Sequence, residues 1–355
     1  MGQDRWMNAI RENRLETLRH CSFYLSAGDP GNPLIIMTHG WPELSLSWRH
    51  QLPFLASLGF HVVAPDMRGY GRSTVYNQHE DYRLELVVQD MLELQDHLGA
   101  DKAIWIGHDW GSPVAWCMAS HHPDRCHAVA SLCVPYGLEK GLDYVIGFVD
   151  REVYPAETFP AGQWEYMRFY EENFDKASAP MDANPYTLMK AIFRKGSPDG
   201  FRQPSATAFV RQQGGWFGGA SEAPDLPIDN DVITEEELEV YVKHLKQNGF
   251  FGPNSWYMNH KANADYAAQA VNDGKIDMPA LFLAARYDYT CESVTSRLAE
   301  PMRQLCADLT EEIIDSGHWM AQEQPQAVNR ALEEWLTRTA DILNKESGSS
   351  GRIPL

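Results

Sequence analysis

The sequence predicts an α/β fold: a mostly parallel sheet flanked by helices, with an inserted helical cap (lid) domain. Short apolar runs alternate with longer amphipathic segments over residues 1–136, which is typical of strands joined by crossover helices. The alternation stops over residues 137–269, where helical and Gly- or Pro-rich segments follow, and resumes over 270–345. We therefore predict a core of 1–136 and 270–345, a cap at 137–269 and a flexible tail at 346–355.

The strands of the core are predicted from short apolar runs that are bounded by turn-forming residues. These runs are LIIMT at 34–38, HVVAP at 61–65, KAIWIG at 102–107, AVASLCV at 128–134 and ALFLAA at 280–285. A further strand is predicted for LTEEII at 309–314. The intervening segments carry apolar residues at helical spacing. They predict helices at 48–59, 84–100, 112–122 and 293–305, and a final helix from Pro325 to about Leu343.

The cap contains one well-defined helix start. Thr234 is followed by Glu237, and this spacing predicts a capping box ahead of LEVYVKHLKQ. The preceding segment, 177–231, is rich in Gly, Pro and acidic residues and leaves the size and access of a substrate open. The insertion could also be a second independent domain.

Composition and charge exclude several classes of protein. Hydrophobic residues make up 44% of the 355 residues, which is enough for a sizeable core and excludes wholesale disorder. Thirty Lys and Arg against 49 Asp and Glu give a formal charge of -19. Because this charge repels phosphate backbones and anionic lipids, we expect no nucleic-acid or membrane partner. A monomer or homodimer is expected, and the sequence does not decide between them.

The cysteines and the apolar runs indicate a cytoplasmic protein. Six cysteines lie singly, without the spacing of a zinc site, so we expect reduced core thiols and no metal. Neither a signal peptide nor an apolar run long enough to span a membrane is evident.

The motif GHDWG at 107–111 directly follows a predicted strand and directly precedes an apolar helix. Glycine at both ends permits the sharp bend that presents a nucleophile above the sheet. The side chain presented here is Asp109, and a carboxylate can displace at a saturated carbon and form an ester that water later splits. Alternatively, Asp109 only caps the following helix.

Hydrolysis of such an ester needs a general base and a group that orients it. His318, in SGHW, follows the predicted strand at 309–314, and Asp288, in RYD, follows the strand at 280–285. Either residue alone could be structural, but the order nucleophile, acid, histidine is that of the α/β-hydrolase arrangement. Asp315 is the competing acid, although it would have to turn back on its own loop.

The motif HGWP at 39–42 ends another predicted strand and fits an oxyanion loop. The intermediate of ester hydrolysis carries negative charge on oxygen, so two fixed backbone N–H groups should face it. We assign these groups to Trp41 and Trp110. The alternative is an ordinary turn marked by Gly and Pro.

Together these segments resemble the epoxide hydrolases of the α/β-hydrolase fold, of the soluble and microbial type. The resemblance covers roughly 15–135 and 250–340, and it is loosest through the middle of the insertion. It implies cofactor-free, water-dependent opening of a small epoxide to a vicinal diol. In that reaction Asp109 would be the nucleophile, and His318 with Asp288 would activate water.

The resemblance also implies two cap tyrosines that donate hydrogen bonds to the epoxide oxygen. EYMRFYEENF places the first at Tyr166, with Tyr170 as its substitute, and NSWYMNH places the second at Tyr257. A phenol is protonated at neutral pH and can stabilise a poor alkoxide leaving group. Either tyrosine could instead be a packing aromatic.

The pocket is expected to be apolar and to favour a hydrophobic epoxide. Each candidate wall could equally belong to the core. The candidates are Trp110, Phe169, Trp256 and Trp319.

Two other functions are compatible with parts of this set of residues. A haloalkane or haloacid dehalogenase uses the same aspartate, but Trp41 offers no side-chain amide for a halide, and position 110 is not the arginine that a fluoroacetate-type enzyme needs. A non-catalytic binding protein of this fold would normally lose part of the set that Asp109, Asp288 and His318 complete.

Overall fold

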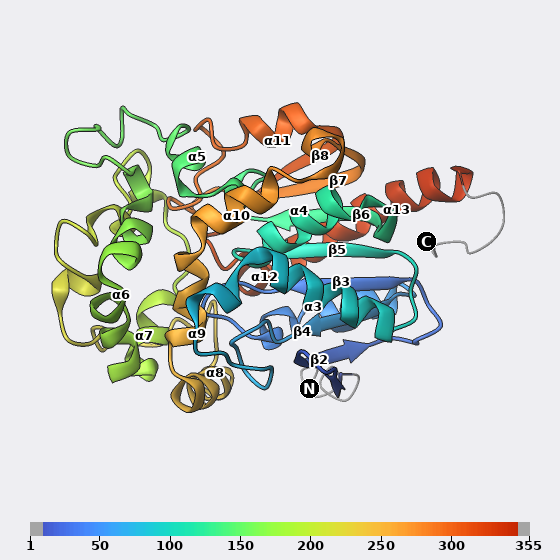
Figure 1. Ribbon diagram of the computed structural model, residues 1–355, viewed down its shortest axis with the longest axis horizontal. Helices are drawn as coiled ribbons and strands as arrows, with labels where there is room; N and C mark the ends of the chain where they lie inside the picture. Colours follow the sequence, from blue (N-terminus) through green and yellow to red (C-terminus); the bar gives the residue numbers. More distant parts are fainter. Residues whose placement is uncertain (1–9, 347–355) are drawn as a thin grey trace.

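The computed structural model describes residues 10–346, which form an eight-stranded sheet flanked by helices (Figure 1). The strand order is β1-β2-β4-β3-β5-β6-β7-β8. β3 to β8 run parallel, whereas β1 and β2 are antiparallel to their neighbours. The strands are β1 Arg11–Glu16, β2 Cys21–Ala27, β3 Leu34–Thr38, β4 His61–Pro65, β5 Ala103–His108, β6 Cys126–Leu132, β7 Ile276–Ala285 and β8 Cys306–Ile314. The predicted α/β fold is confirmed.

The central parallel strands are apolar because both faces of the sheet are covered there, whereas the edge strand β8 is largely polar and partly exposed. β3, β4 and β5 are buried at every position. α4 packs on β5 and β6, and α2 packs against α13. The helices of the core are α2 Gln51–Ser57, α3 Leu84–His97, α4 Gly111–His121, α11 Glu300–Leu305, α12 Met320–Glu323 and α13 Pro325–Glu346.

Two sequence predictions for the core were wrong in detail. The antiparallel strands β1 and β2 were not predicted. β1 is a charged, largely exposed edge strand without an apolar run, whereas β2 is buried at all but its first position. The helix predicted at 293–305 begins only at Glu300. The carboxylate of Glu292 accepts hydrogen bonds from the backbone N–H groups of Val294, Thr295 and Ser296, which folds this segment into turns instead.

The segment between β6 and β7 consists of helices and loops, which lie at the left of Figure 1. It lies at the end of the sheet where the parallel strands terminate, not beside an edge strand. Its α-helices are α5 Leu142–Ile146, α6 Glu165–Ala183, α7 Pro185–Ile192, α8 Glu235–Asn248, α9 Phe251–Ser255 and α10 His260–Ala267. The domain boundaries at 137 and 269 remain a prediction. The predicted tail at 346–355 lies outside the described residues, except for Glu346.

The capping box of α8 is present and also joins the cap to the core. The Thr234 hydroxyl accepts the Glu237 N–H, and the Glu237 carboxylate accepts the Thr234 N–H. The same carboxylate accepts a hydrogen bond from Arg49 Nη2 at 3.0 Å. Arg49 follows β3 in the core, so one glutamate starts a cap helix and anchors it.

Candidate active site

Asp109 lies at a sharp turn between β5 and α4. Its φ of 49° is in the left-handed region, which a non-glycine residue adopts only under strain. The turn is tight enough that a Cβ on Gly111 would lie 2.1 Å from the carbonyl oxygen of Thr38. A Cβ on Gly40 would lie 2.2 Å from Asp109 Oδ1. The predicted bend is therefore present, and glycine is required around it.

The two carboxylate oxygens of Asp109 have different surroundings. The Trp41 N–H donates a 2.6 Å hydrogen bond to Oδ1, while Oδ2 lies 3.4 Å from His318 Nε2. No hydrogen bond from the Trp110 N–H to this carboxylate occurs among residues 10–346, although Trp110 is next in the chain. One oxygen is thus fixed by a backbone donor, and the other faces the histidine.

His318 and Asp288 form a tight pair on the loops that follow β8 and β7. His318 Nδ1 donates to Asp288 Oδ2 at 2.6 Å, and the Asp288 side chain is 3% exposed. Asp288 Oδ1 accepts the N–H groups of Thr290 and Cys291. The competing acid Asp315 forms an ion pair with Arg286 instead. Of the two carboxylates, only Asp288 is joined to His318.

The pair perturbs the pKa of both partners. Burial disfavours the imidazolium, but the Asp288 carboxylate and the contact with Asp109 outweigh burial and raise the pKa of His318 well above 6.5. Burial likewise raises the pKa of Asp288, yet His318 and the backbone donors outweigh it and lower this pKa below 3.8. The two carboxylates thus favour the imidazolium form of His318 over the neutral ring.

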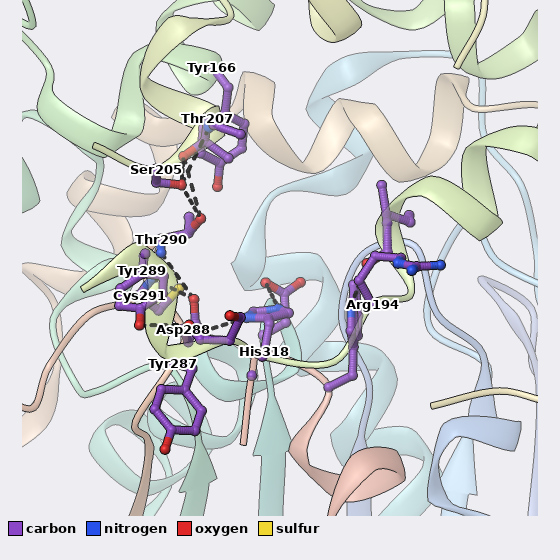
Figure 2. A pocket seen from close by; sticks show the side chains of 18 of the residues that line it. Tyr166, Arg194, Ser205, Thr207, Tyr287, Asp288, Tyr289, Thr290, Cys291 and His318 are labelled. Atoms are coloured by element: carbon purple, nitrogen blue, oxygen red, sulfur yellow. Dashed lines mark hydrogen bonds and ion pairs between the residues drawn. The ribbon is translucent and has the colours of Figure 1, made fainter. Parts of the chain in front are cut away.

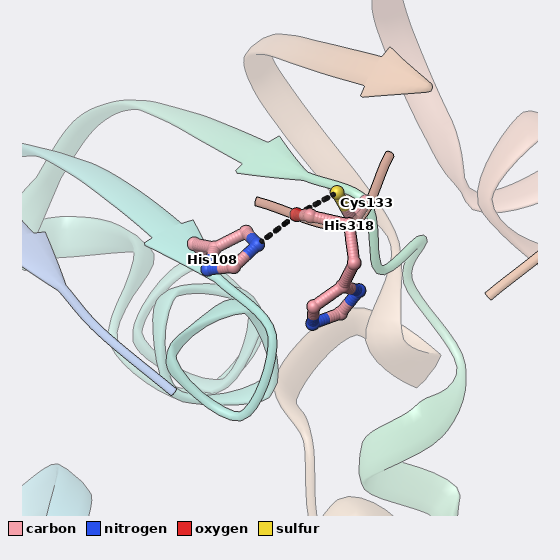
Figure 3. Close-up of side chains that lie close together, drawn as sticks. All are labelled: His108, Cys133 and His318. Atoms are coloured by element: carbon pink, nitrogen blue, oxygen red, sulfur yellow. Dashed lines mark hydrogen bonds between the residues drawn. The ribbon is translucent and has the colours of Figure 1, made fainter. Parts of the chain in front are cut away.

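The backbone of His318 is held by two donors (Figure 3). Its carbonyl oxygen accepts hydrogen bonds from His108 Nε2 at 2.7 Å and from Cys133 Sγ at 3.1 Å. His108 Nδ1 contacts Glu43 Oε2 at 2.7 Å. A carbonyl and a carboxylate only accept hydrogen bonds, so both ring nitrogens of His108 carry a proton. This buried ion pair was missed in the sequence, where its partners are 65 residues apart.

Two sets of three residues are close enough to hold a metal ion among the described residues: His108, Cys133 and His318, and Asp288, Cys291 and His318. Both include His318 and the hydrogen bonds already described. A metal bound to the His318 ring would compete with its pairing to Asp288.

Tyr166 on α6 and Tyr257 on the 3-10 helix Trp256–Met258 both line the cavity above Asp109. Their ring centroids are 5.5 Å apart, and burial raises both pKa values well above 10, so both phenols are protonated. The hydroxyl of Tyr170 instead contacts Asn254 Oδ1 at 3.3 Å and Met181 Sδ. Tyr170 is not among the residues lining this cavity.

Comparisons with known proteins agree with this geometry. Residues 33–325 match the family model described as alpha/beta hydrolase fold. The chain is 35% identical to Epoxide hydrolase A of Mycobacterium tuberculosis over 322 residues, which are 88% of this chain and 93% of that protein. This chain belongs to the epoxide hydrolases.

Two further relatives of the epoxide hydrolase extend the comparison. The chain is 34% identical to Bifunctional epoxide hydrolase 2 of Sus scrofa, and the match covers 87% of this chain but 52% of that protein. It is 33% identical to the crystal structure of Epoxide Hydrolase A from Mycobacterium thermoresistibile, with a TM-score of 0.74, and the match covers 92% of this chain and 98% of that one. The chain thus spans about half of the bifunctional relative and nearly all of the other two.

The cavity of the epoxide hydrolase has a volume of about 480 Å³ and is lined by Asp109, Asp288 and His318. Figure 2 shows Asp288 and His318 in its wall. The cap segment from Ile192 to Thr207 forms one wall. Trp216, which was not predicted, lines the cavity and stacks on Trp41 with ring centroids 6.1 Å apart. The segment 177–231, whose role the sequence left open, therefore shapes the site.

The predicted apolar walls need correction. Trp319 lines the cavity, but Trp110, Phe169 and Trp256 do not. Trp110 and Trp256 are buried with ring centroids 6.0 Å apart, and Trp256 Nε1 donates to the carbonyl oxygen of Arg68. Phe169 is 3% exposed on α6. These three aromatics are buried, and the cavity wall includes polar residues of the cap such as Gln203 and Ser205.

The six cysteines are unpaired, and five are buried, as expected of reduced core thiols. Over residues 10–346, none of the helices combines the length and apolar character that a bilayer crossing requires.

Proposed function

We propose that this epoxide hydrolase opens a small epoxide to a vicinal diol through a covalent ester on Asp109. The observation that carries the proposal is the arrangement around that carboxylate: Oδ1 accepts the Trp41 N–H, and Oδ2 lies 3.4 Å from His318 Nε2. Water is the co-substrate, and the reaction as proposed uses no cofactor.

In the first step, Asp109 Oδ2 attacks one carbon of the epoxide ring. A C–O ester bond forms as the ring C–O bond breaks, and the departing oxygen takes a proton from Tyr166 or Tyr257. The two phenols suit this role because they line the cavity and their raised pKa keeps them protonated. Holding the ring between the tyrosines and the carboxylate supplies a large part of the rate.

Ester formation prepares His318 for the second step. It removes the negative charge of Asp109, one of the interactions that raise the pKa of His318. The imidazolium proton then passes to the phenolate and restores the tyrosine. Asp288 keeps the neutral imidazole oriented through the 2.6 Å contact at Nδ1.

In the second step, His318 removes a proton from water, and the oxygen of that water attacks the carboxyl carbon of Asp109. The oxyanion that forms on Oδ1 is stabilised by the Trp41 N–H and, in our proposal, by the Trp110 N–H. The diol leaves with the proton from His318. The carboxylic acid left on Asp109 returns its proton to His318, so one water is consumed per diol.

A dehalogenase is less consistent with the site. The side-chain N–H of Trp41 donates to Asn254 Oδ1 at 2.8 Å and is not available to hold a halide. The two phenols, in contrast, match an oxygen leaving group. We also place the protein in the cytoplasm, since its six thiols are unpaired.

The test is to trap the ester. His318→Gln protein incubated with an epoxide should gain the mass of the substrate on the peptide that contains Asp109, because alkylation does not need the base. His97→Gln, at an exposed end of α3, is the matched control and should turn over normally. An unmodified Asp109 peptide at saturating substrate, or undiminished turnover by Asp109→Ala, would contradict the proposal.

A further inference from the structure

Three hydroxyl groups meet in the wall of the active-site cavity. Ser205 Oγ lies 2.8 Å from Thr207 Oγ1 and 3.0 Å from Thr290 Oγ1, and the two threonine oxygens are 3.4 Å apart. Ser205 and Thr207 belong to the cap and Thr290 to the core, and all three line the cavity. We call Ser205, Thr207 and Thr290 the hydroxyl cluster; Figure 2 shows it between Tyr166 and Asp288.

The hydroxyl cluster is held in place from both sides. The Ser205 N–H donates to the hydroxyl of Tyr154, which in turn donates to the carbonyl oxygen of Tyr289. The Thr290 N–H donates to Asp288 Oδ1. The cluster is therefore fixed relative to the acid that orients His318, and a group bound there has a defined position relative to the reacting atoms.

The hydroxyl cluster retains hydrogen-bonding capacity for a ligand. Each hydroxyl has one proton and two lone pairs, so three protons leave acceptor positions unused even when all three contacts form. The 3.4 Å contact between Thr207 and Thr290 is the weakest, and exchanging it for a ligand oxygen frees one donor. The cluster can thus donate to, or accept from, an oxygen on the substrate.

The charges around the cavity favour a neutral substituent. Asp109 and Asp288 are both in the wall, and Asp288 directly contacts the Thr290 backbone. The Lys195 ammonium in the wall is 2.6 Å from Asp231, and Arg194 lies near Asp229. Because these cations are already neutralised, a carboxylate or phosphate on the substrate would gain little attraction there.

We propose that the hydroxyl cluster is a specificity subsite that selects epoxides carrying a neutral oxygen, as in an ether, hydroxyl or carbonyl group, on the chain beyond the ring. This inference rests on the proposed function, since it concerns the same cavity. The proposed substrate differs from the hydrophobic epoxide expected from the sequence, because it carries a polar group at the end far from the ring.

The experiment compares isosteric substrates. The reference is 1,2-epoxyoctane, and the probes are analogues in which an ether oxygen replaces the fourth, fifth or sixth chain atom; the first of these is butyl glycidyl ether. For at least one oxygen position, kcat/KM of the wild-type enzyme should exceed the hydrocarbon value by about fivefold, the effect of one net hydrogen bond. The ratio of kcat/KM for the ether analogue to kcat/KM for 1,2-epoxyoctane measures the contribution of the hydroxyl cluster. The value for 1,2-epoxyoctane alone measures the ring-opening activity.

Thr207→Val keeps the shape of the side chain and removes the hydroxyl, so the ratio of kcat/KM for the ether to kcat/KM for 1,2-epoxyoctane should fall to about one. Thr290→Val should lower the same ratio. The control is Ser197→Ala, which removes a hydroxyl from the same cavity wall but outside the cluster, and should leave the ratio unchanged.

Two results would overturn the inference. One is a wild-type ratio near one at every oxygen position. The other is a Thr207→Val enzyme in which both substrates are affected equally, because the cluster would then only hold the cap to the core. Turnover of 1,2-epoxyoctane with either result leaves the proposed function standing, whereas no turnover of any of these epoxides counts against that function itself.

Discussion

Replacing Glu43 by Gln tests whether the ion pair behind His318 stabilises the fold. Glu43 is 1% exposed and contacts His108 Nδ1, while its carboxylate also accepts hydrogen bonds from the Gly40 N–H and Gln322 Nε2. Burial raises the pKa of Glu43, but the charge of His108 outweighs it and lowers this pKa from 4.5 to about 2. Glu43→Gln keeps the shape and removes the charge.

The pKa shift sets the size of the expected effect. Lowering a carboxyl pKa by this amount corresponds to about 3 kcal/mol of stability at neutral pH. Because the pKa of Glu43 is lower in the folded state, this stability is present above about pH 4.5 and is lost as the pH falls toward 2. Glu43→Gln should therefore unfold about 3 kcal/mol more easily at pH 7, and the deficit should narrow by about 1 kcal/mol by pH 4.

Urea unfolding of the wild type and Glu43→Gln at the two pH values measures this deficit. Glu236→Gln, an exposed position on α8, is the matched control and should change stability by less than about 0.5 kcal/mol. A deficit under about 1 kcal/mol at pH 7, or a larger deficit at pH 4 than at pH 7, would refute the reasoning. We also expect a lower kcat, since His108 holds the backbone of His318.

Three further predictions follow from the same structure. Tyr166→Phe and Tyr257→Phe should each slow alkylation in single-turnover experiments by about tenfold to a hundredfold, with substrate binding less affected; unchanged alkylation rates in both would exclude the phenols as donors. Burial raises the pKa of Glu139 to about 7, so its ionisation opposes folding as the pH rises from 4.5 through 7. Glu139→Gln should gain up to about 3 kcal/mol in unfolding free energy at pH 8 and little at pH 4, and equal gains at both would contradict this. Gly111→Ala should fail to accumulate as soluble, folded enzyme on expression, since its Cβ would lie 2.1 Å from the carbonyl oxygen of Thr38; normal yield and activity would show that the turn can relax.

The buried parallel strands could be predicted because a short apolar run bounded by turn-forming residues is typical of a buried strand and of few other structures. The same pattern placed Asp109, Asp288 and His318 at strand ends, and these ends meet because the strands are parallel. The edge strand β1 was not predictable in this way, since it buries little and carries no periodic apolar signal.

The cavity wall could not be read from the sequence, because nothing local encodes it. Ser205 and Thr207 lie in a segment of short 3-10 turns without helical or strand periodicity, and Thr290 follows some eighty residues later. Phe169 and Trp256 are apolar wherever the cap places them, so composition could not decide between wall and interior. Pairing of Glu43 with His108 is likewise a property of the folded chain alone.

Glu237 has a consequence for transplanting caps between relatives. Its carboxylate both starts α8 and accepts a hydrogen bond from Arg49, which the core supplies. A foreign cap grafted at the ends of β6 and β7 would bring its own first helical turn, and without an acid at this position it would leave the largely buried Arg49 side chain without its carboxylate partner. Such a chimaera should keep an acid at the position of Glu237, or exchange Arg49 at the same time, so that the contact between the grafted cap and the core remains stable.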